Sequence, residues 1–205
     1  MYAPSKVREV VELLVVVDAS GSVSADEWTS ALAFTKTLPQ ALSSGNPAME
    51  LRVGVIQFAS SAKCDIALTS YASEGASAAD FAKRVDAIRR DSGGTVFHLA
   101  ITCCEQAFRA SPRPDGRCIV VFQTDGADDA GDNGAKKLSD AMASLKATAR
   151  GLLVIGVGVG YGANLRGLRS VAHPTENVMA VSDYGALTGI ISSLGDTIRL
   201  AGTDA

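Results

Sequence analysis

The chain has 205 residues and a formal net charge of −3, from 19 basic and 22 acidic residues. This length suits one domain that buries its own core without a disulfide or a structural metal. With 47% hydrophobic and 20% charged residues, the composition excludes intrinsic disorder and collagen-like repeats, and the lack of a basic surplus disfavours a nucleic-acid partner.

The apolar segments are too short to cross a membrane. The longest runs of large apolar residues are 13–17 and 152–155, far below the ~20 residues that a spanning helix needs. We therefore expect no membrane insertion by this domain. The first ten residues lack the apolar core of a signal peptide, but we expect the domain to be part of a larger protein, so its compartment stays open.

Six apolar segments predict β-strands. The first, 10–17 (VVELLVVV), is nearly continuous and rich in β-branched residues, which is typical of a parallel strand that is covered on both faces. The other predicted strands are 51–58, 62–68, 118–123, 152–157 and 178–181. Segment 62–68 follows the second strand after a short serine turn, which favours an antiparallel pair at the edge of the sheet.

Helical signals separate most of these strands. Ser24 and Glu27 form an S-x-x-E capping box, and Pro39 is expected to end the helix that follows or to lie in its last turn. Two further helices are predicted at 78–90 and 96–108. Three more are marked by Leu138, Met142 and Leu145, by Leu165, Leu168 and Val171, and by a closing stripe of Leu187, Ile190, Ile191, Leu194 and Ile198.

The alternation of strands and helices predicts an α/β fold. We expect a doubly wound, mostly parallel six-stranded sheet with one antiparallel edge strand and helices on both faces. No linker, low-complexity tract or repeat interrupts the pattern. The sequence therefore predicts a single domain over 1–205, with a core of about 9–200.

Polar residues follow two predicted strands and open one helix. They lie in Asp18-Ala19-Ser20-Gly21-Ser22, in Thr124-Asp125-Gly126 and in Gly93-Gly94-Thr95. In open α/β sheets, ligands bind beyond the carboxyl ends of the strands, so these segments are expected to meet. The set offers only oxygen ligands, which suit Mg²⁺, Mn²⁺ or Ca²⁺ better than zinc.

These three segments together resemble the metal-ion-dependent adhesion site (MIDAS) of von Willebrand factor type A (VWA) domains, which include the integrin I domains. The resemblance covers essentially the whole chain and implies the Rossmann-like VWA fold. It implies that the hydroxyls of Ser20, Ser22 and Thr95 bind the cation, and that Asp18 and Asp125 act through water or directly. The family often has a second threonine two residues after the first, where this chain has Phe97.

The resemblance also implies a function. A first shell made mostly of hydroxyls leaves the cation electrophilic, so a protein partner is expected to supply a carboxylate to it. The expected module is a non-catalytic, cation-dependent adhesion domain at the cell surface or outside the cell. One alternative is an intracellular VWA assembly module in a multiprotein complex.

The other alternative is an enzyme. Asp18 also resembles the nucleophile of haloacid-dehalogenase-like, Mg²⁺-dependent phosphotransferases, but that family has a second aspartate where this chain has Ser20. No phosphate-binding loop or nucleophile elbow is present in the sequence. We therefore predict no catalytic residues.

The remaining polar and glycine residues are expected to be structural. His98 is expected at the surface, and the four cysteines are expected to be buried free thiols. The acidic residues Asp128, Asp129 and Asp132 are expected to form a solvated loop. The glycines Gly156, Gly158, Gly160 and Gly162 do not match a dinucleotide-binding spacing and are expected in turns at a strand end.

Overall fold

The computed structural model of the protein describes residues 9–46, 48–72, 75–110 and 112–200. A six-stranded sheet in the order β3-β2-β1-β4-β5-β6 forms its centre. The strands are β1 (Val10–Asp18), β2 (Glu50–Phe58), β3 (Ala62–Tyr71), β4 (Gly116–Thr124), β5 (Leu153–Val159) and β6 (Val178–Val181). All neighbours are parallel except β2 and β3, so the predicted antiparallel edge strand is confirmed.

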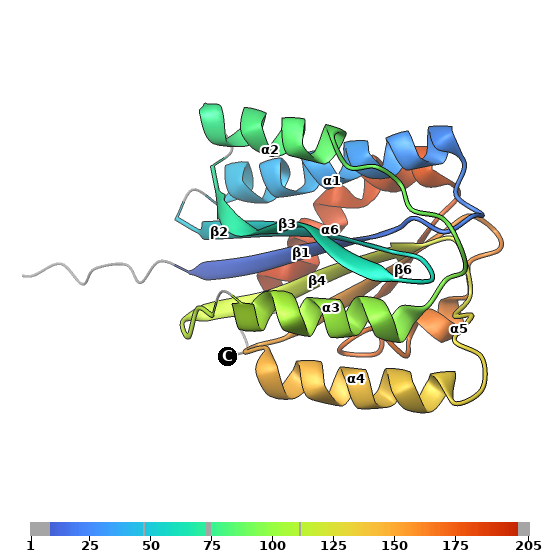
Figure 1. The fold of residues 1–205 in the computed structure, drawn as a ribbon. Coiled ribbons are helices and arrows are strands. Elements are labelled where there is room, and N and C mark those ends of the chain that lie inside the picture. The colour runs from blue at the N-terminus through green and yellow to red at the C-terminus, as the bar shows by residue number, and fades with distance from the viewer. Residues whose placement is uncertain (1–8, 47, 73–74, 111, 201–205) are drawn as a thin grey trace, which may run out of the picture.

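Helices cover both faces of this sheet. They are α1 (Ala25–Gly45), α2 (Ala76–Asp86), α3 (Phe97–Ala110), α4 (Gly134–Thr148), α5 (Leu165–Leu168), the 3₁₀ helix η1 (Tyr184–Ile190) and α6 (Ile191–Leu200). Figure 1 shows α1, α2 and α6 on one face, with α3 and α4 on the other. Among the described residues, no helix has the length and apolar character to cross a membrane.

Two apolar cores lie on opposite sides of the sheet. Leu13 and Val15 of β1 pack toward α1, η1 and α6, whereas Leu14 and Val16 pack toward α3 and α4. All nine residues of β1 are buried. The continuous apolar run of this strand is thus explained by helices on both faces.

The first helix begins as predicted but does not end as predicted. At its N-terminus, Glu27 N–H donates to Ser24 Oγ (3.3 Å) and Ser24 N–H donates to Glu27 Oε2 (2.8 Å), which completes the capping box. Pro39 lies inside α1, which continues to Gly45, so the expected end at this residue is wrong. Pro39 is itself buried beside Leu38, and this apolar packing offsets the backbone hydrogen bond that proline cannot donate.

Two other helices are shorter than predicted. Helix α2 ends at Asp86, and α5 ends at Leu168. Ile88 and Val171 lie beyond these ends but are buried all the same. Apolar spacing indicates which residues face a core, and a turn can bury such a residue as well as a helix can.

The closing segment is divided into two helices. Its apolar stripe faces the core as predicted, but the first part is the 3₁₀ helix η1 and only the second part, α6, is α-helical. Asp183 caps η1 by accepting a hydrogen bond from Ala186 N–H (3.0 Å). Gly185 and Gly189 lie within η1, and glycine disfavours a regular α-helix.

Two of the glycines expected in turns lie within a strand instead. Gly156 and Gly158 belong to β5, and a Cβ atom at Gly158 would lie 2.6 Å from a methyl carbon of Leu165. These glycines therefore allow the α5 segment to approach the sheet closely. Gly160, with a φ of +81°, does lie in the turn after β5.

Candidate metal-binding site

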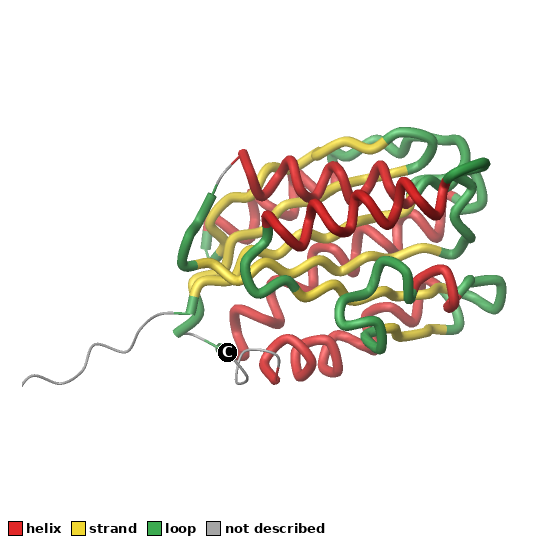
Figure 2. The backbone as a smooth tube through the Cα atoms, turned by 90° about the horizontal axis from the view of Figure 1, so that it is seen from below, coloured by secondary structure: helices red, strands yellow, loops and turns green. Residues whose placement is uncertain are grey.

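The predicted site lies where the strand order reverses. The chain moves outward from β1 through β2 to β3, and the later strands β4, β5 and β6 lie on the other side of β1. The loops after β1 and β4 therefore leave the sheet side by side at the usual ligand position of an α/β fold. Figures 1 and 2 show these loops, and the start of α3, gathered at the right-hand end of the sheet.

Asp18 anchors the first of these loops. Its side chain has no exposed surface, and its Oδ1 accepts a hydrogen bond from Ser20 N–H (2.8 Å). Its Oδ2 accepts a hydrogen bond from the hydroxyl of Thr124 at the end of β4. One carboxylate thus fixes the turn after β1 and joins it to the neighbouring strand.

A chain of hydrogen bonds joins the two serines to the other aspartate. Ser20 Oγ lies 3.0 Å from Ser22 Oγ, and the Ser22 hydroxyl donates to Asp125 Oδ1 (2.9 Å). Ser20 is buried, whereas Ser22 is exposed and Asp125 is half-buried. Three side chains whose oxygen atoms can bind a metal ion, from two loops that are far apart in the sequence, therefore form one cluster that reaches the surface.

The loop before α3 brings Thr95 to the same place. Gly21 N–H donates to the carbonyl of Gly93 (2.9 Å), which joins this loop to the one after β1. Thr95 is only 5% exposed, and a Cβ atom at Gly126 would lie 3.2 Å from its Oγ1. Thr95 therefore lies directly against the Asp125-Gly126 turn, and the structure brings all five predicted residues together.

Gly93 is required by this loop. Its φ of +131° disfavours other residues, and a Cβ atom there would lie 2.5 Å from Ser60 Oγ. Ser60 Oγ also accepts a hydrogen bond from Gly94 N–H (2.8 Å). The turn between β2 and β3 thereby supports the loop that carries Thr95, a role that the sequence did not indicate.

Two residues of the acidic loop hold Thr95 and α3 in position. Asp129 Oδ2 accepts from Thr95 N–H (3.0 Å), and Asp129 N–H donates to the Thr95 carbonyl (2.7 Å). Asp128 Oδ1 accepts from the N–H of Phe97, the first residue of α3 (3.0 Å). Asp129 and Asp132 are exposed and Asp128 is half-buried, so the loop is solvated as expected. Asp128 and Asp129 have in addition a positioning role that was not predicted.

Burial dominates the electrostatics of the site. It raises the pKa of Asp18 above its usual value, although hydrogen bonds from Ser20 and Thr124 oppose this effect. Burial also raises the pKa of Asp125, against a hydrogen bond from Ser22. Two carboxylates whose charged forms are disfavoured lie close together, so a cation between them would relieve that cost.

The donor set fits a hard divalent cation. Among the described residues, no three His, Cys, Asp or Glu side chains gather to hold a metal ion, so binding here depends on hydroxyl groups. The residues present offer two serine hydroxyls, one threonine hydroxyl and two carboxylates, all of them oxygen ligands. His98 is half-buried rather than at the surface, and its Nδ1 has no protein hydrogen-bond partner among the described residues.

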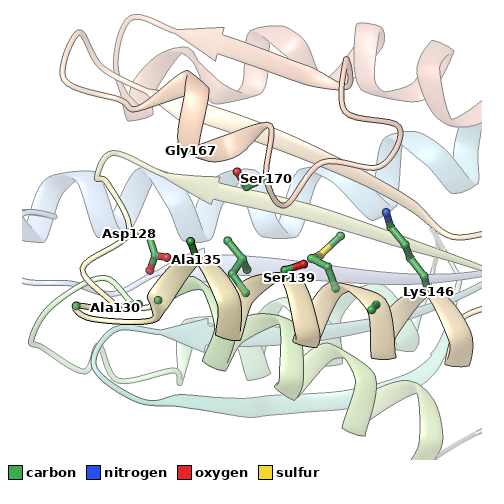
Figure 3. Close-up of a pocket in the computed structure, with 12 residues that line it drawn as sticks. Asp128, Ala130, Ala135, Ser139, Lys146, Gly167 and Ser170 are labelled. Atoms are coloured by element: carbon green, nitrogen blue, oxygen red, sulfur yellow. The ribbon is translucent and has the colours of Figure 1, made fainter.

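A groove of about 610 Å³ begins beside this site. It runs along α4 from Asp128 to Lys146, and Figure 3 shows Ala135 and Ser139 on α4 opposite Gly167 and Ser170. Most of its lining residues are small, and many are exposed. The groove is open rather than enclosed, and it shares Asp128 with the loops of the candidate site.

The chain belongs to the von Willebrand factor type A domain family, whose sequence profile matches residues 12–193. Domains of this family are commonly adhesion or protein-binding modules and are typically non-catalytic. No curated protein matches the chain.

Several solved structures share the fold. Proximal thread matrix protein 1 of the mussel byssus matches with a TM-score of 0.74 and 21% identity, over 92% of this chain and 48% of that chain. A structure of the same protein with a zinc-occupied MIDAS motif matches with a TM-score of 0.71 and 20% identity, over 93% of this chain and 46% of that chain.

The pilus adhesin SpaC from Lactobacillus rhamnosus GG matches with a TM-score of 0.72 and 12% identity, over 95% of this chain and 31% of that chain. The chain therefore spans less than half the length of these three structures. At such identities, the likeness shows the fold alone.

Proposed function

We propose that this domain is a divalent-cation-dependent protein-binding module of the adhesion type. One observation carries the proposal: the hydroxyls of Ser20 and Ser22 and the carboxylate of Asp125 form a single hydrogen-bonded cluster, although 103 residues separate Ser22 from Asp125. Residues that only form turns need not contact the side chains of another loop, whereas these residues do. Three adjacent oxygen donors at the sheet end are a suitable set for Mg²⁺ or Mn²⁺.

Some of these residues would bind the cation, and others would hold the binding residues in position. Ser20, Ser22 and Thr95 would hold the cation through their hydroxyls, with Asp125 beside them. Asp18 would act mainly through the orientation that it gives to Ser20 and Thr124. When bound, the cation supplies a positive centre with an open position for a carboxylate oxygen.

The protein partner would supply that carboxylate. With three neutral hydroxyls around it, the cation keeps most of its charge for an incoming acidic side chain. We propose a surface or extracellular setting within a larger protein, and the pilus adhesin that shares the fold supports this setting. An assembly role inside the cell would use the same site with another partner.

Small carboxylates test this chemistry without a known partner. With Mn²⁺ bound to the folded chain, acetate should displace a coordinated water molecule and lower the water-proton relaxation enhancement. Acetamide, which has the same size but no charge, should have little effect. If acetate and acetamide act alike while Mn²⁺ stays bound, the cation is structural and the proposed mode of partner binding is wrong.

A further inference from the structure

A second groove lies on the same side of the sheet as α3, away from the candidate metal site. It has a volume of about 570 Å³ and separates the edge strand β3 from α3. Its walls are largely apolar, with Leu68 on the strand and Ala107 and Ala110 on the helix. Two thiols line it from opposite walls, Cys64 on β3 and Cys103 on α3.

The two thiols differ in access. Cys64 is exposed, contrary to the expectation that all four cysteines are buried, and its Sγ donates to the carbonyl of Ile66 (3.3 Å). It is exposed because β3 is an edge strand that α3 covers incompletely. Cys103 is 8% exposed, and its thiol has no hydrogen-bond partner among the described residues.

The backbone brings the two residues toward each other. Cys64 pairs with Ile56 of β2, and the Ile56 side chain belongs to the same apolar core as Cys103. Cα atoms of β3 and α3 approach to within 8 Å. Both thiols line the same groove, and Cys64 lies near enough to act electrostatically on the Cys103 thiol. Disulfides typically join residues whose Cα atoms lie about 4.4–6.8 Å apart, so the cross-link requires β3 and α3 to hold the two residues at that separation.

We propose that Cys64 and Cys103 form a reversible modification site, at which a low-molecular-weight disulfide converts the two thiols into a cross-link between β3 and α3. In the first step, the Cys64 thiolate attacks the added disulfide, forms a mixed disulfide and releases one thiolate. The Cys103 thiol then loses its proton to solvent and attacks Cys64 Sγ, which releases the second thiolate. Two protein thiols are oxidised, and one added disulfide is reduced to two thiols.

The order of attack follows from the surroundings of each thiol. Burial raises the pKa of Cys103 to about 11, and burial and Asp65 raise the pKa of Cys64. The thiolate is the reactive form, so the reaction is slow at neutral pH and accelerates as the pH rises. Cys104 and Cys118 are buried and do not line the groove, so they stay reduced.

The cross-link has a consequence for the metal-binding loops. Helix α3 begins two residues after Thr95, so a bond from Cys103 to the edge strand fixes the helix that follows this loop. It also closes a loop of about 40 residues in the unfolded chain, which should raise the melting temperature by roughly 5–15 °C.

Incubation of the folded chain with oxidised glutathione at about pH 8.5 tests the proposal. We expect the main product to lack two hydrogens, to carry no glutathione and to contain a peptide pair joined through Cys64 and Cys103. The Cys103→Ser variant should stop at a mixed disulfide on Cys64, and Cys64→Ser should not react. The Cys118→Ser variant is the matched control and should cross-link as the unmodified chain does.

One result overturns the proposal. If the unmodified chain behaves like Cys103→Ser and keeps glutathione on Cys64, the two thiols do not reach each other. The near-ultraviolet circular dichroism of each variant shows whether it is folded. A Cys103→Ala variant, which removes the thiol without adding a polar group, gives the same comparison if the serine variant does not fold.

Discussion

At the scale of single residues, the five predicted site residues come together, but the supporting roles of Ser60 and of the acidic loop were missed. Ser20, Ser22 and Asp125 could be predicted because each lies next to the end of an apolar strand. The role of Asp129 could not, because it depends on one loop folding over another and accepting a specific backbone N–H. A carboxylate near a helix start is a common cap, but the sequence does not show which loop supplies it.

Asp129→Ala should weaken both the fold and the cation site. The change removes an acceptor for Thr95 N–H and should cost about 1 kcal/mol of unfolding free energy, as the loss of a helix cap does. Because Thr95 is then less well placed, the affinity for Mg²⁺ measured by isothermal titration calorimetry should fall several-fold. Asp132→Ala removes the same charge from the same loop and should leave the affinity nearly unchanged; equal losses would mean that only loop charge matters.

Protons should compete with the cation. The pKa values of Asp18 and Asp125 are raised in the folded chain, so without metal these groups contribute stability at low pH, and that contribution is lost as the pH rises through their folded pKa values. Mg²⁺ binding requires the charged forms of these two carboxylates. The stabilising effect of Mg²⁺ should therefore grow as the pH rises through the range in which they lose their protons, which begins above about pH 4. Thermal melting in EDTA and in Mg²⁺ between about pH 4 and 8 measures both trends, and a Mg²⁺ effect that is independent of pH would exclude these carboxylates.

At the scale of elements, apolar patterning predicts which segments face a core better than it predicts their exact geometry. All six strands and the capping box at Ser24 were predicted, because strands here are short apolar runs bounded by polar turns. The irregular pairing of β2 and β3 near Gly54 was not predicted, since a bulge depends on contacts across two strands. The split between η1 and α6 was missed for a similar reason, because a stripe of apolar residues fits either type of helix.

Gly54→Ala should destabilise the edge of the sheet. A Cβ atom at Gly54 would lie 2.9 Å from the carbonyl oxygen of Ile66 and 2.8 Å from a methyl carbon of Leu14, and the backbone atom cannot easily move. We expect a loss of about 1–3 kcal/mol in urea unfolding. Gly189→Ala adds the same methyl group where no atom outside its own helix and chain neighbours lies within 4 Å. Because alanine suits a helix better than glycine, this variant should not be destabilised; if it loses as much stability as Gly54→Ala, close approach at the bulge is not the cause.

At the scale of the whole molecule, the topology places the site. The fold class and the antiparallel edge strand were predictable from the order of apolar segments, and the reversal of strand order between β1 and β4 explains why two distant loops meet. The β3 edge of the sheet holds an exposed thiol and a groove that the sequence did not reveal. The exposure of Cys64 depends on how far α3 covers β3.

The central claim is that these loops bind a divalent cation, and thermal melting in Mg²⁺ against EDTA tests it most directly. At a hundredfold excess of Mg²⁺ over its Kd, binding to the native state alone adds about 2.7 kcal/mol, which should raise the melting temperature by roughly 5–10 °C. Ser20→Ala/Ser22→Ala should lose this shift, whereas Ser192→Ala/Ser193→Ala, two exposed serines of α6, should keep it. A shift that survives in the Ser20→Ala/Ser22→Ala variant, or that is absent from the unmodified chain, would contradict the account.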